Sequence, residues 1–493
     1  MADRTLSAGM RWSGISVVGR ELARSLFTIV LARLVGPDDF GIVAQALVYI
    51  GIIGLLVDQG FSSALIQRKE VDPDMPGVVV SVNLAVGATL TALTLAIAPF
   101  WASFMRTPEL TLILIVFAPS LVLRAATVTP RAMLIREMDF RTIGISDIVA
   151  ALAGGVIGVS VAITGGGYWA VVAQVVGTDI VLLAAMLMFG AGWRPNLHLR
   201  QLRAIAAFSG RAFAAGLLIN SLSRNIDNLL VGRVQGPQAL AFYGLAYRLL
   251  LLPVQLALST VATVLFPAFS RLAHDLDALR AELARTTRAV AMAALPAMAL
   301  VAAAAPQLVA MVFGPQWEPA IPIVQVLALA GALQAIYQSS TTALVLGLGR
   351  DKLNLRYAWL TTLTATAGIV AGLPFGPFGV AVGYTASTAL LLPVEWFLRR
   401  HLLALPLRGQ IALLMPATHV AAWMAGTYLV IAVTIAGHES AVLVTGLAAS
   451  VGVGALVLRL AHPALLNELV HLVKRLGGGQ PVAVGEPVVD EAM

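Results

Sequence analysis

The chain has 493 residues, of which 59% are hydrophobic and only 12% are charged, and its mean hydropathy is +0.88. Soluble domains average about 45–50% apolar and 25% charged residues, so this composition excludes an ordinary soluble protein and indicates an integral membrane protein. The net charge of +7 would suggest nucleic acid in a soluble protein, but the positions of the basic residues favour membrane orientation instead, and we expect no nucleic-acid partner. Because the sequence has no cysteine, disulfides, thiolate metal sites and cysteine nucleophiles are excluded.

Apolar windows bounded by Gly, Pro or charged clusters predict about 14 membrane-spanning helices of about 20 residues each. The windows fall near 12–34, 41–64, 78–101, 111–129, 143–163, 167–189, 207–232, 240–268, 289–313, 320–347, 354–373, 378–398, 410–435 and 441–459. Their continuous apolar runs disfavour a strand barrel, whose strands alternate in polarity over about ten residues. The first window carries Arg20, Glu21 and Arg24 and no cleavage site, so we interpret it as a retained helix. We therefore predict an all-α, polytopic membrane protein.

Basic residues gather in every second connection between the predicted helices. With the N-terminus inside, about 24 of the 32 Lys and Arg residues are cytoplasmic, Arg399 among them, while the opposite side keeps only Arg33, Arg106 and Arg233. This asymmetry predicts that both termini are cytoplasmic. Among the inside segments, 271–288 has an amphipathic pattern, which predicts a solvated connector on the membrane surface, with a cytoplasmic partner site as the alternative.

One phrase occurs twice in the sequence, as "RLVGPDDFGIVAQA" at 33–46 and as "RVQGPQALAFYGLA" at 233–246. Six predicted helices separate equivalent points of the two copies, and an even number of spans preserves orientation, so we predict parallel repeats. The expected organisation is an N-lobe at 1–200 and a pseudo-symmetric C-lobe at 201–405, each of six helices, followed by a C-terminal helix pair at 406–460 and a cytoplasmic tail at 461–493.

Polar residues form a stripe on the first helix of each predicted lobe. Ser16, Arg20, Arg24 and Thr28 recur every fourth residue in the first helix, and the seventh helix carries Asn220, Arg224, Asp227 and Asn228. Under the repeat register, Arg24 corresponds to Arg224. An arginine at bilayer depth costs about 2.5–3.5 kcal/mol on insertion scales, and such residues usually face a water-filled cavity or a partner. We expect both stripes to face one central cleft.

Guanidinium groups bind phosphate oxygens through two parallel hydrogen bonds, so the stripes predict an anionic, phosphate-bearing substrate. The predicted diphosphate-binding residues are Arg20, Arg24, Arg224 and Arg248, with Ser16, Thr28, Asn220 and Asn228 as the polar lining. The alternative is internal neutralisation, because Glu21 lies three residues from Arg24 and Asp227 three from Arg224. Glu21 and Asp227 are also candidates for ion coupling. For Arg124 and Arg248, snorkelling to the interface is the favoured alternative role.

Further segments carry a family resemblance over residues 5 to about 400. They are "LARLVGPDDFGIVAQA" with "DQGFSSALIQRKE", then "NIDNLLVGRVQGPQALAFYGLAYRLLLLPVQ", "FPAFSRL" and "VFGPQWEPAIPIVQVLAL". In their order and spacing the chain resembles the oligosaccharide/polysaccharide flippase family of the multidrug/oligosaccharidyl-lipid/polysaccharide superfamily, whose members include lipopolysaccharide and exopolysaccharide biosynthesis proteins.

The resemblance implies a bacterial inner-membrane flippase that moves undecaprenyl-diphosphate-linked oligosaccharide repeat units from the cytoplasmic to the periplasmic leaflet for surface polysaccharide assembly. It implies alternating access of two lobes around a basic cavity, where Arg24 and Arg224 match lining positions. Bond chemistry, a cofactor and a metal are not implied. The implied partners are the lipid-linked oligosaccharide and membrane lipids, and a polysaccharide polymerase is left open.

Two other functions remain as alternatives. A cation-coupled multidrug antiporter of the same superfamily would share the fold but predicts an acidic cavity, whereas the first lobe lacks isolated carboxylates at depth. A membrane glycan polymerase or ligase would need an external catalytic surface, and the short outer connections, such as "GPDD" and "FGPQWEP", leave no room for one. The sequence also lacks a zinc-protease helix, a phosphate loop and a nucleophile elbow, so we expect no enzyme activity.

Overall fold

The computed structural model describes residues 2–54, 56–57, 65–66, 71–189, 194–196, 222–249, 268–435 and 437–477. For residues 2–18, 222–225, 339 and 471–477 it describes the backbone alone. Regular structure in these ranges is helical throughout, and no strand occurs in them. The predicted all-α class is confirmed.

Ten helical runs in the described ranges are long and apolar enough to cross a membrane. They coincide with predicted windows between 41 and 189 and between 289 and 459. The windows at 207–232 and 240–268 lie largely outside the described residues, so the total of about fourteen spans stays a prediction. The protein is a multi-pass membrane protein, as its composition requires.

The chain forms two compact units. Unit 1 comprises Met1–Gly244 together with Val312–Trp317, and unit 2 comprises Leu245–Met311 together with Glu318–Met493. The predicted boundary between lobes at 200 falls in a stretch that is not described, and the division into two six-helix lobes stays a prediction.

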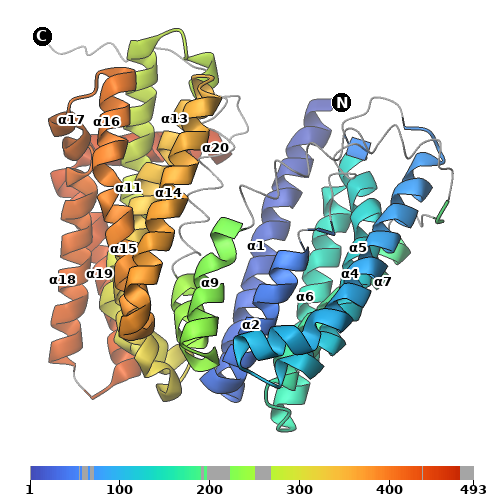
Figure 1. Cartoon of the computed structure of the whole chain (residues 1–493). Coiled ribbons are helices and arrows are strands. Elements are labelled where there is room, and N and C mark those ends of the chain that lie inside the picture. Colours follow the sequence, from blue (N-terminus) through green and yellow to red (C-terminus); the bar gives the residue numbers. More distant parts are fainter. Residues whose placement is uncertain are drawn as a thin grey trace, which may run out of the picture. The chain divides into compact units, whose positions relative to one another are not determined.

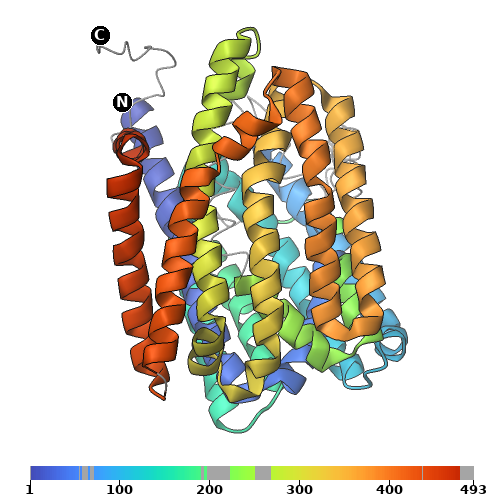
Figure 2. The ribbon, with the colours of Figure 1, turned by 90° about the vertical axis from the view of Figure 1, so that its left-hand side faces the viewer.

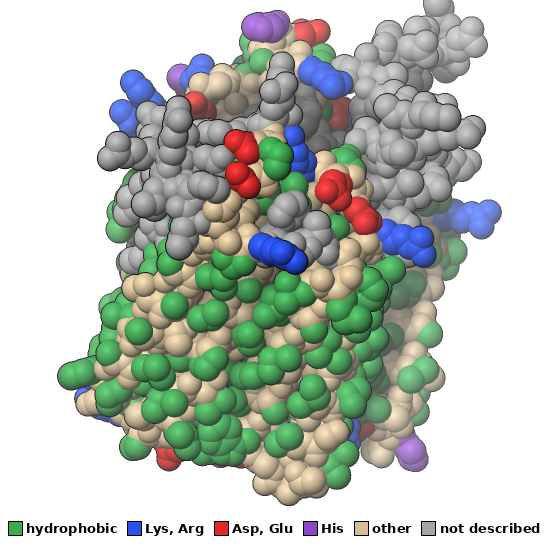
Figure 3. Space-filling model, turned by 90° about the vertical axis from the view of Figure 1, so that its right-hand side faces the viewer, with side chains coloured by type: hydrophobic (Ala, Val, Ile, Leu, Met, Phe, Trp, Pro, Cys, Tyr) green, Lys and Arg blue, Asp and Glu red, His purple; other side chains and the backbone are tan. Residues whose placement is uncertain are grey.

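Unit 1 is a helix bundle in which both sequence neighbours and helices distant in sequence pack side by side (Figure 1). Its most extensive contacts join α6 to α7, α4 to α5 and α1 to α6. The helices are α1 (Ala2–Val35), α2 (Pro37–Gly54), α4 (Met75–Met105), α5 (Leu110–Arg136), α6 (Phe140–Ile163), α7 (Trp169–Phe189) and α9 (Leu222–Val234). On the face of this unit seen in Figure 3, apolar side chains form a broad band and charged side chains gather above it, the distribution expected of a lipid-facing surface.

The two copies of the repeated phrase share one backbone conformation. Gly36 and Gly236 both have left-handed φ values, 83° and 92°, which glycine adopts without strain, and a proline follows each as the first residue of a helix. The glycine carbonyls accept hydrogen bonds from Phe40 N and Leu240 N respectively, each at 3.2 Å. This correspondence supports the predicted repeat.

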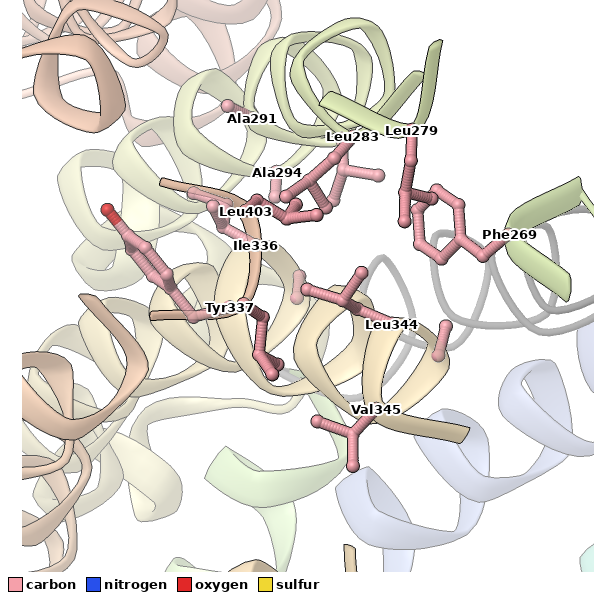
Figure 4. Packing of buried hydrophobic residues seen from close by; sticks show 14 of the residues in the cluster. Phe269, Leu279, Leu283, Ala291, Ala294, Ile336, Tyr337, Leu344, Val345 and Leu403 are labelled. Carbon is pink, nitrogen blue, oxygen red and sulfur yellow. The ribbon is translucent and has the colours of Figure 1, made fainter. Parts of the chain in front are cut away.

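Unit 2 contains the remaining described helices. In chain order these are α11 (Leu276–Val312), η1 (Pro315–Ala320), α12 (Ile321–Leu333), the π-helical turn η2 (Gln334–Gln338), α13 (Ser339–Gly347), α14 (Asp351–Gly372), η3 (Leu373–Phe375), α15 (Gly376–Leu390), α16 (Leu392–Leu403), α17 (Leu407–Ala412), α18 (Met415–Thr434), α19 (Glu439–Ala461) and α20 (Pro463–Gly477). A core cluster that includes Leu283, Ala291 and Leu344 holds the start of α11 against η2, α13 and the end of α16 (Figure 4). A second cluster, centred on Tyr428, joins α11 to α18 and α19 (Figure 2).

Two segments differ from their sequence-based descriptions. Residues 276–288, predicted to be a connector lying on the membrane surface, are the first turns of α11 and continue without a break into its apolar part. Residues 463–477, within the predicted tail, form the helix α20. The amphipathic pattern of 271–288 indicated a helix, but the direction of its axis depends on tertiary contacts, and the helix at 463–477 was not predicted.

Glycines allow the closest helix contacts in both units. A Cβ atom at Gly368 of α14 would overlap the carbonyl of Gly383 of α15, and one at Gly154 of α6 would overlap Thr178 of α7. The backbones therefore approach so closely that no larger residue fits, which is a common basis of helix association in membranes.

We predict that Gly368→Ala lowers the free energy of unfolding by about 1–3 kcal/mol, the usual cost of overpacking. The matched control is Gly426→Ala in α18, because no atom lies within 4 Å of where its Cβ would be. Thermal unfolding of the detergent-purified variants measures the difference. Equal melting temperatures for the two variants would show that the α14–α15 contact is not tight.

Candidate functional site

The polar stripe of α1 lies in a cluster of charges inside unit 1. Arg20 donates from Nε to Oε1 of Glu21 at 3.2 Å and from Nη1 to Oδ2 of Asp147 at 3.1 Å. Arg24 lies 3.8 Å from the same Glu21 oxygen, so the predicted three-residue pairing is confirmed. Thr28 is half-buried one turn further along, and the side chain of Ser16 is outside the described set.

Asp147 of α6 is the centre of this cluster, and the sequence analysis did not identify it. Its side chain is only 6% exposed. Both of its oxygens accept hydrogen bonds from Arg131 of α5, at 2.8 Å and 2.9 Å, and one also accepts from Arg20. A two-pronged arginine–carboxylate pair is among the strongest polar contacts available to side chains. Asp147 therefore links α1, α5 and α6.

A second carboxylate, Asp179 of α7, holds Arg124 of α5. Arg124 Nε donates to Asp179 Oδ2 at 2.9 Å. For Arg124 the favoured sequence interpretation, snorkelling to an interface, is therefore wrong, because a carboxylate within the bundle provides a nearer partner. The expectation that the first lobe lacks isolated carboxylates at depth is therefore wrong, because Asp147 and Asp179 are buried in α6 and α7. Their positions in the sequence gave no sign that each would meet an arginine from another helix.

These contacts join Arg20, Arg24 and Arg131 to Glu21 and Asp147, while Arg124 pairs separately with Asp179. We treat the four arginines and three carboxylates as one cluster with one excess positive charge, because Arg124 also interacts electrostatically with Arg24. Arg24 has the longest ion pair of the cluster and keeps 56% of its side chain exposed, whereas the side chains of Arg20, Arg124 and Arg131 are 35% exposed or less. It interacts electrostatically with both Arg20 and Arg124. The excess charge is therefore concentrated at the exposed guanidinium of Arg24, which suits an anionic ligand.

The predicted stripe of the seventh helix is described only in part. Asn220 and the side chain of Arg224 lie outside the described residues, so their relation to Arg24 stays a prediction. Asp227 is 5% exposed and accepts from its neighbour Asn228 N at 2.8 Å and from Tyr243 OH at 3.3 Å. Arg248 is exposed and falls in unit 2.

Trp317 lies at the end of unit 1 that contains the two Gly-Pro turns. Its side chain is fully buried, and its Nε1 donates to the carbonyl of Ala32 at 2.9 Å. The rings of Phe40 and Phe242, one following each turn, meet it edge to face with centroids 5.7 Å and 5.9 Å away. An aromatic cluster therefore brings the two repeat copies together.

A buried polar contact accompanies this aromatic cluster. Gln45 of α2 donates from Nε2 to the carbonyl of Gly232 of α9 at 2.7 Å. We refer to these residues together as the repeat clasp, which comprises Phe40, Gln45, Gly232, Phe242 and Trp317.

Unit 2 contains a buried polar network that the sequence analysis also missed. Arg399, predicted to lie in an inside connection, is 1% exposed and donates to Ser340 Oγ at 2.6 Å and to the Tyr337 carbonyl at 3.4 Å. That carbonyl belongs to η2, where the π-helical turn changes the ordinary helix hydrogen-bond pattern. Glu395, one turn before Arg399, accepts from the hydroxyl of Tyr357. Every polar group named here has a partner within unit 2, so we assign the network to packing.

Within the described ranges, no group of three His, Asp or Glu side chains is arranged to hold a metal ion. The chemistry available at the candidate site is therefore that of arginines, carboxylates and hydroxyls, which bind and orient charged ligands.

We predict that Asp147→Asn lowers the free energy of unfolding by about 2–3 kcal/mol, because two arginines lose the carboxylate charge that they share. Breaking a fully buried ion pair costs about 3–5 kcal/mol, and the effect here is smaller because Arg131 is partly solvated. Adding Arg131→Gln should restore part of the loss. Asp277→Asn, which removes a carboxylate that is 88% exposed, is the control and should leave the melting temperature unchanged. If Asp147→Asn melts with the control, the cluster does not stabilise unit 1.

Three comparisons relate the chain to known proteins. Over 395 residues it is 25% identical to the lipopolysaccharide biosynthesis protein WzxC of Escherichia coli strain K12, covering 78% of each chain. Over 371 residues it is 24% identical to the succinoglycan biosynthesis transport protein ExoT of Rhizobium meliloti strain 1021, covering 75% of this chain and 74% of ExoT. Its fold is similar to that of the lipid II flippase MurJ in an inward closed conformation, with a TM-score of 0.71 at 15% identity, over 95% of this chain and 99% of MurJ.

The family comparison covers the segment in which both copies of the repeated phrase lie. Residues 30–322, more than half of the 493, match the family described as polysaccharide biosynthesis protein. The match agrees with the resemblance found in the sequence and with the helical fold. The chain therefore belongs to the polysaccharide biosynthesis protein family of multi-pass membrane proteins.

Proposed function

We propose that the protein is a flippase that moves undecaprenyl-diphosphate-linked oligosaccharide units from the cytoplasmic to the periplasmic leaflet of a bacterial inner membrane. The observation that carries this proposal is the arginine cluster within apolar unit 1, in which Arg24 retains an exposed guanidinium. The relatives support a glycan cargo, since ExoT is named a succinoglycan biosynthesis transport protein. The lipid II flippase MurJ shares the fold.

The residues of the cluster take different roles in this proposal. Arg24 contacts the diphosphate, because its guanidinium is exposed and only loosely paired. Arg20 is a positioning residue, since Asp147 and Glu21 already hold it. We retain Arg224 and Arg248 as further diphosphate ligands, with the polar lining residues Ser16, Thr28, Asn220 and Asn228, and Glu21 and Asp227 as candidates for ion coupling.

A cation-exporting antiporter is less compatible with this site. Export of a cation needs a carboxylate whose charge is available to the cargo, whereas Asp147 and Asp179 are each held by an arginine within 3 Å. The chemistry of the cluster therefore favours an anionic cargo. Transport of such a cargo makes and breaks no covalent bond, so the proposal requires neither a catalytic residue nor a cofactor.

The repeat clasp is the contact that must open if the cargo leaves on the outer side. Its polar contacts are the hydrogen bonds from Gln45 to Gly232 and from Trp317 to Ala32, and the rest is aromatic packing. Such contacts can separate without leaving an uncompensated charge.

An inside-negative potential would favour outward movement by about 2.3 kcal/mol per negative charge at 100 mV. A polymerase of lipid-linked glycans would act on the delivered unit.

The proposed orientation places both termini in the cytoplasm. Because the sequence has no cysteine, single introduced cysteines report topology without background. We expect Gln238→Cys and Gln316→Cys to react with a membrane-impermeant maleimide in intact spheroplasts, and Asp275→Cys and Asp351→Cys to react only after permeabilisation; all four positions are exposed. The opposite labelling pattern would overturn the orientation.

Arg24→Gln should reduce export of surface polysaccharide about ten- to hundredfold, because a charged hydrogen bond contributes about 1.5–3 kcal/mol. Arg24→Lys should restore it only in part, since an ammonium cannot make the paired contact. The matched control is Arg285→Gln in α11, where the arginine also pairs with a glutamate three residues before it, at 3.0 Å. Export is measured as cell-surface polysaccharide at equal protein level.

Internal neutralisation predicts a different result. If Arg24 only balances Glu21, the double variant Arg24→Gln with Glu21→Gln should export normally, whereas a diphosphate ligand cannot be replaced in this way. Normal export by a folded double variant would therefore reject the proposed role of Arg24.

A further inference from the structure

The C-terminal helix α20 is amphipathic over its 15 residues, PALLNELVHLVKRLG. In helical register, one side of α20 carries the apolar residues Leu466, Leu469, Val473 and Leu476. The other side carries polar residues at a seven-residue spacing, Asn467 with Lys474 and Glu468 with Arg475. An amphipathic helix of this kind needs an apolar surface or an interface against which to lie.

The axis of α20 runs crosswise to the helices that precede it. Figure 1 shows α20 lying across unit 2 while α18 and α19 stand upright, and Figure 2 shows the same helix end-on at the level of the end of α19. Since α19 has the length and apolar composition of a membrane span, a helix perpendicular to it lies parallel to the membrane plane.

Two contacts fix the rotation of α20 about its own axis. Leu465 is 7% exposed, and Glu468 Oε1 accepts from Arg288 Nη2 of α11 at 3.1 Å. Leu465 and Glu468 therefore face the protein. Two exposed residues lie away from these contacts. Val470, 41% exposed, is one turn from Leu466 and adjoins the apolar side of α20, whereas Asn467 lies on its polar side.

The surface next to α20 is already a lipid-facing one. Near the end of α19, Leu456 and Leu460 are 53% and 72% exposed, which in a membrane span means contact with lipid tails. The chain turns at His462 into α20, where the exposed residue Val470 is also apolar.

We propose that α20 lies in the lipid headgroup interface of the cytoplasmic leaflet, with Val470 toward the acyl chains and Asn467 toward water, and that its occupant is a bilayer surface rich in anionic lipid. The choice of leaflet rests on the proposed orientation. Anionic headgroups match Lys474 and Arg475, which the sequence places in the last turn of α20, since basic residues near a membrane surface associate with acidic lipid. The helix would thereby anchor the end of α19 and, through Arg288, the start of α11.

The test compares Val470→Cys and Asn467→Cys, each carrying a nitroxide, in full-length protein reconstituted into vesicles of phosphatidylglycerol and phosphatidylcholine. Both positions are exposed in the protein itself, so a difference between them reports the membrane. We expect collisions with oxygen to dominate at 470 and collisions with a water-soluble nickel chelate to dominate at 467. Equal access of the chelate to both labels overturns the proposal, and so does protection of both, which would mean that protein covers this face.

The lipid class is tested separately. The double variant Lys474→Gln/Arg475→Gln removes both basic residues. In vesicles with phosphatidylglycerol it should weaken the association of α20 with the bilayer surface about fivefold per basic residue removed. In vesicles of phosphatidylcholine alone the same change should have no effect, and an equal effect in both lipids would overturn the anionic preference. These readouts involve no transport, so they stand apart from the test of Arg24.

Discussion

The structure depends on one constraint, that a charge in an apolar helix bundle persists only where an opposite charge or a set of hydrogen bonds meets it. Asp147 satisfies it with Arg131 and Arg20, and Asp179 satisfies it with Arg124. In unit 2, Arg399 satisfies it with hydroxyl and carbonyl oxygens around a π-helical turn. Each of these groups joins helices that are distant in sequence, so the same contacts that solvate the charges also fix how the helices pack.

Against this background, the exposure of Arg24 distinguishes it from its neighbours. The cluster has one arginine more than it has carboxylates. Of its four arginines, Arg24 has the longest distance to a carboxylate oxygen, so the excess positive charge lies mainly on Arg24. An uncompensated cation held by a rigid, paired surround can bind an anion without first breaking a strong internal contact. Arg20 and Asp147 therefore contribute to the proposed binding by keeping the surroundings of Arg24 fixed.

Packing that involves no charge has a complementary role. The Gly368–Gly383 contact and the repeat clasp both depend on close backbone approach, but they differ in what separation would cost. The glycine contact is continuous along two helices and suits a permanent element of unit 2. The clasp lies near the Gly-Pro turns and relies on two hydrogen bonds and edge-to-face rings, which suits a contact that opens and closes during transport.

The sequence by itself determined the all-α membrane class, most helix positions, the Gly-Pro repeat and the pairing of Glu21 with Arg24, because hydrophobic length, turn residues and three-residue spacing act locally along the chain. It also carried the family resemblance. Only the tertiary structure decided that Asp147 and Asp179 hold Arg131 and Arg124, that Arg399 is buried, and that α20 lies across the bundle. These outcomes depend on which helices become neighbours, and a lone carboxylate in an apolar stretch does not indicate in sequence which distant arginine will reach it.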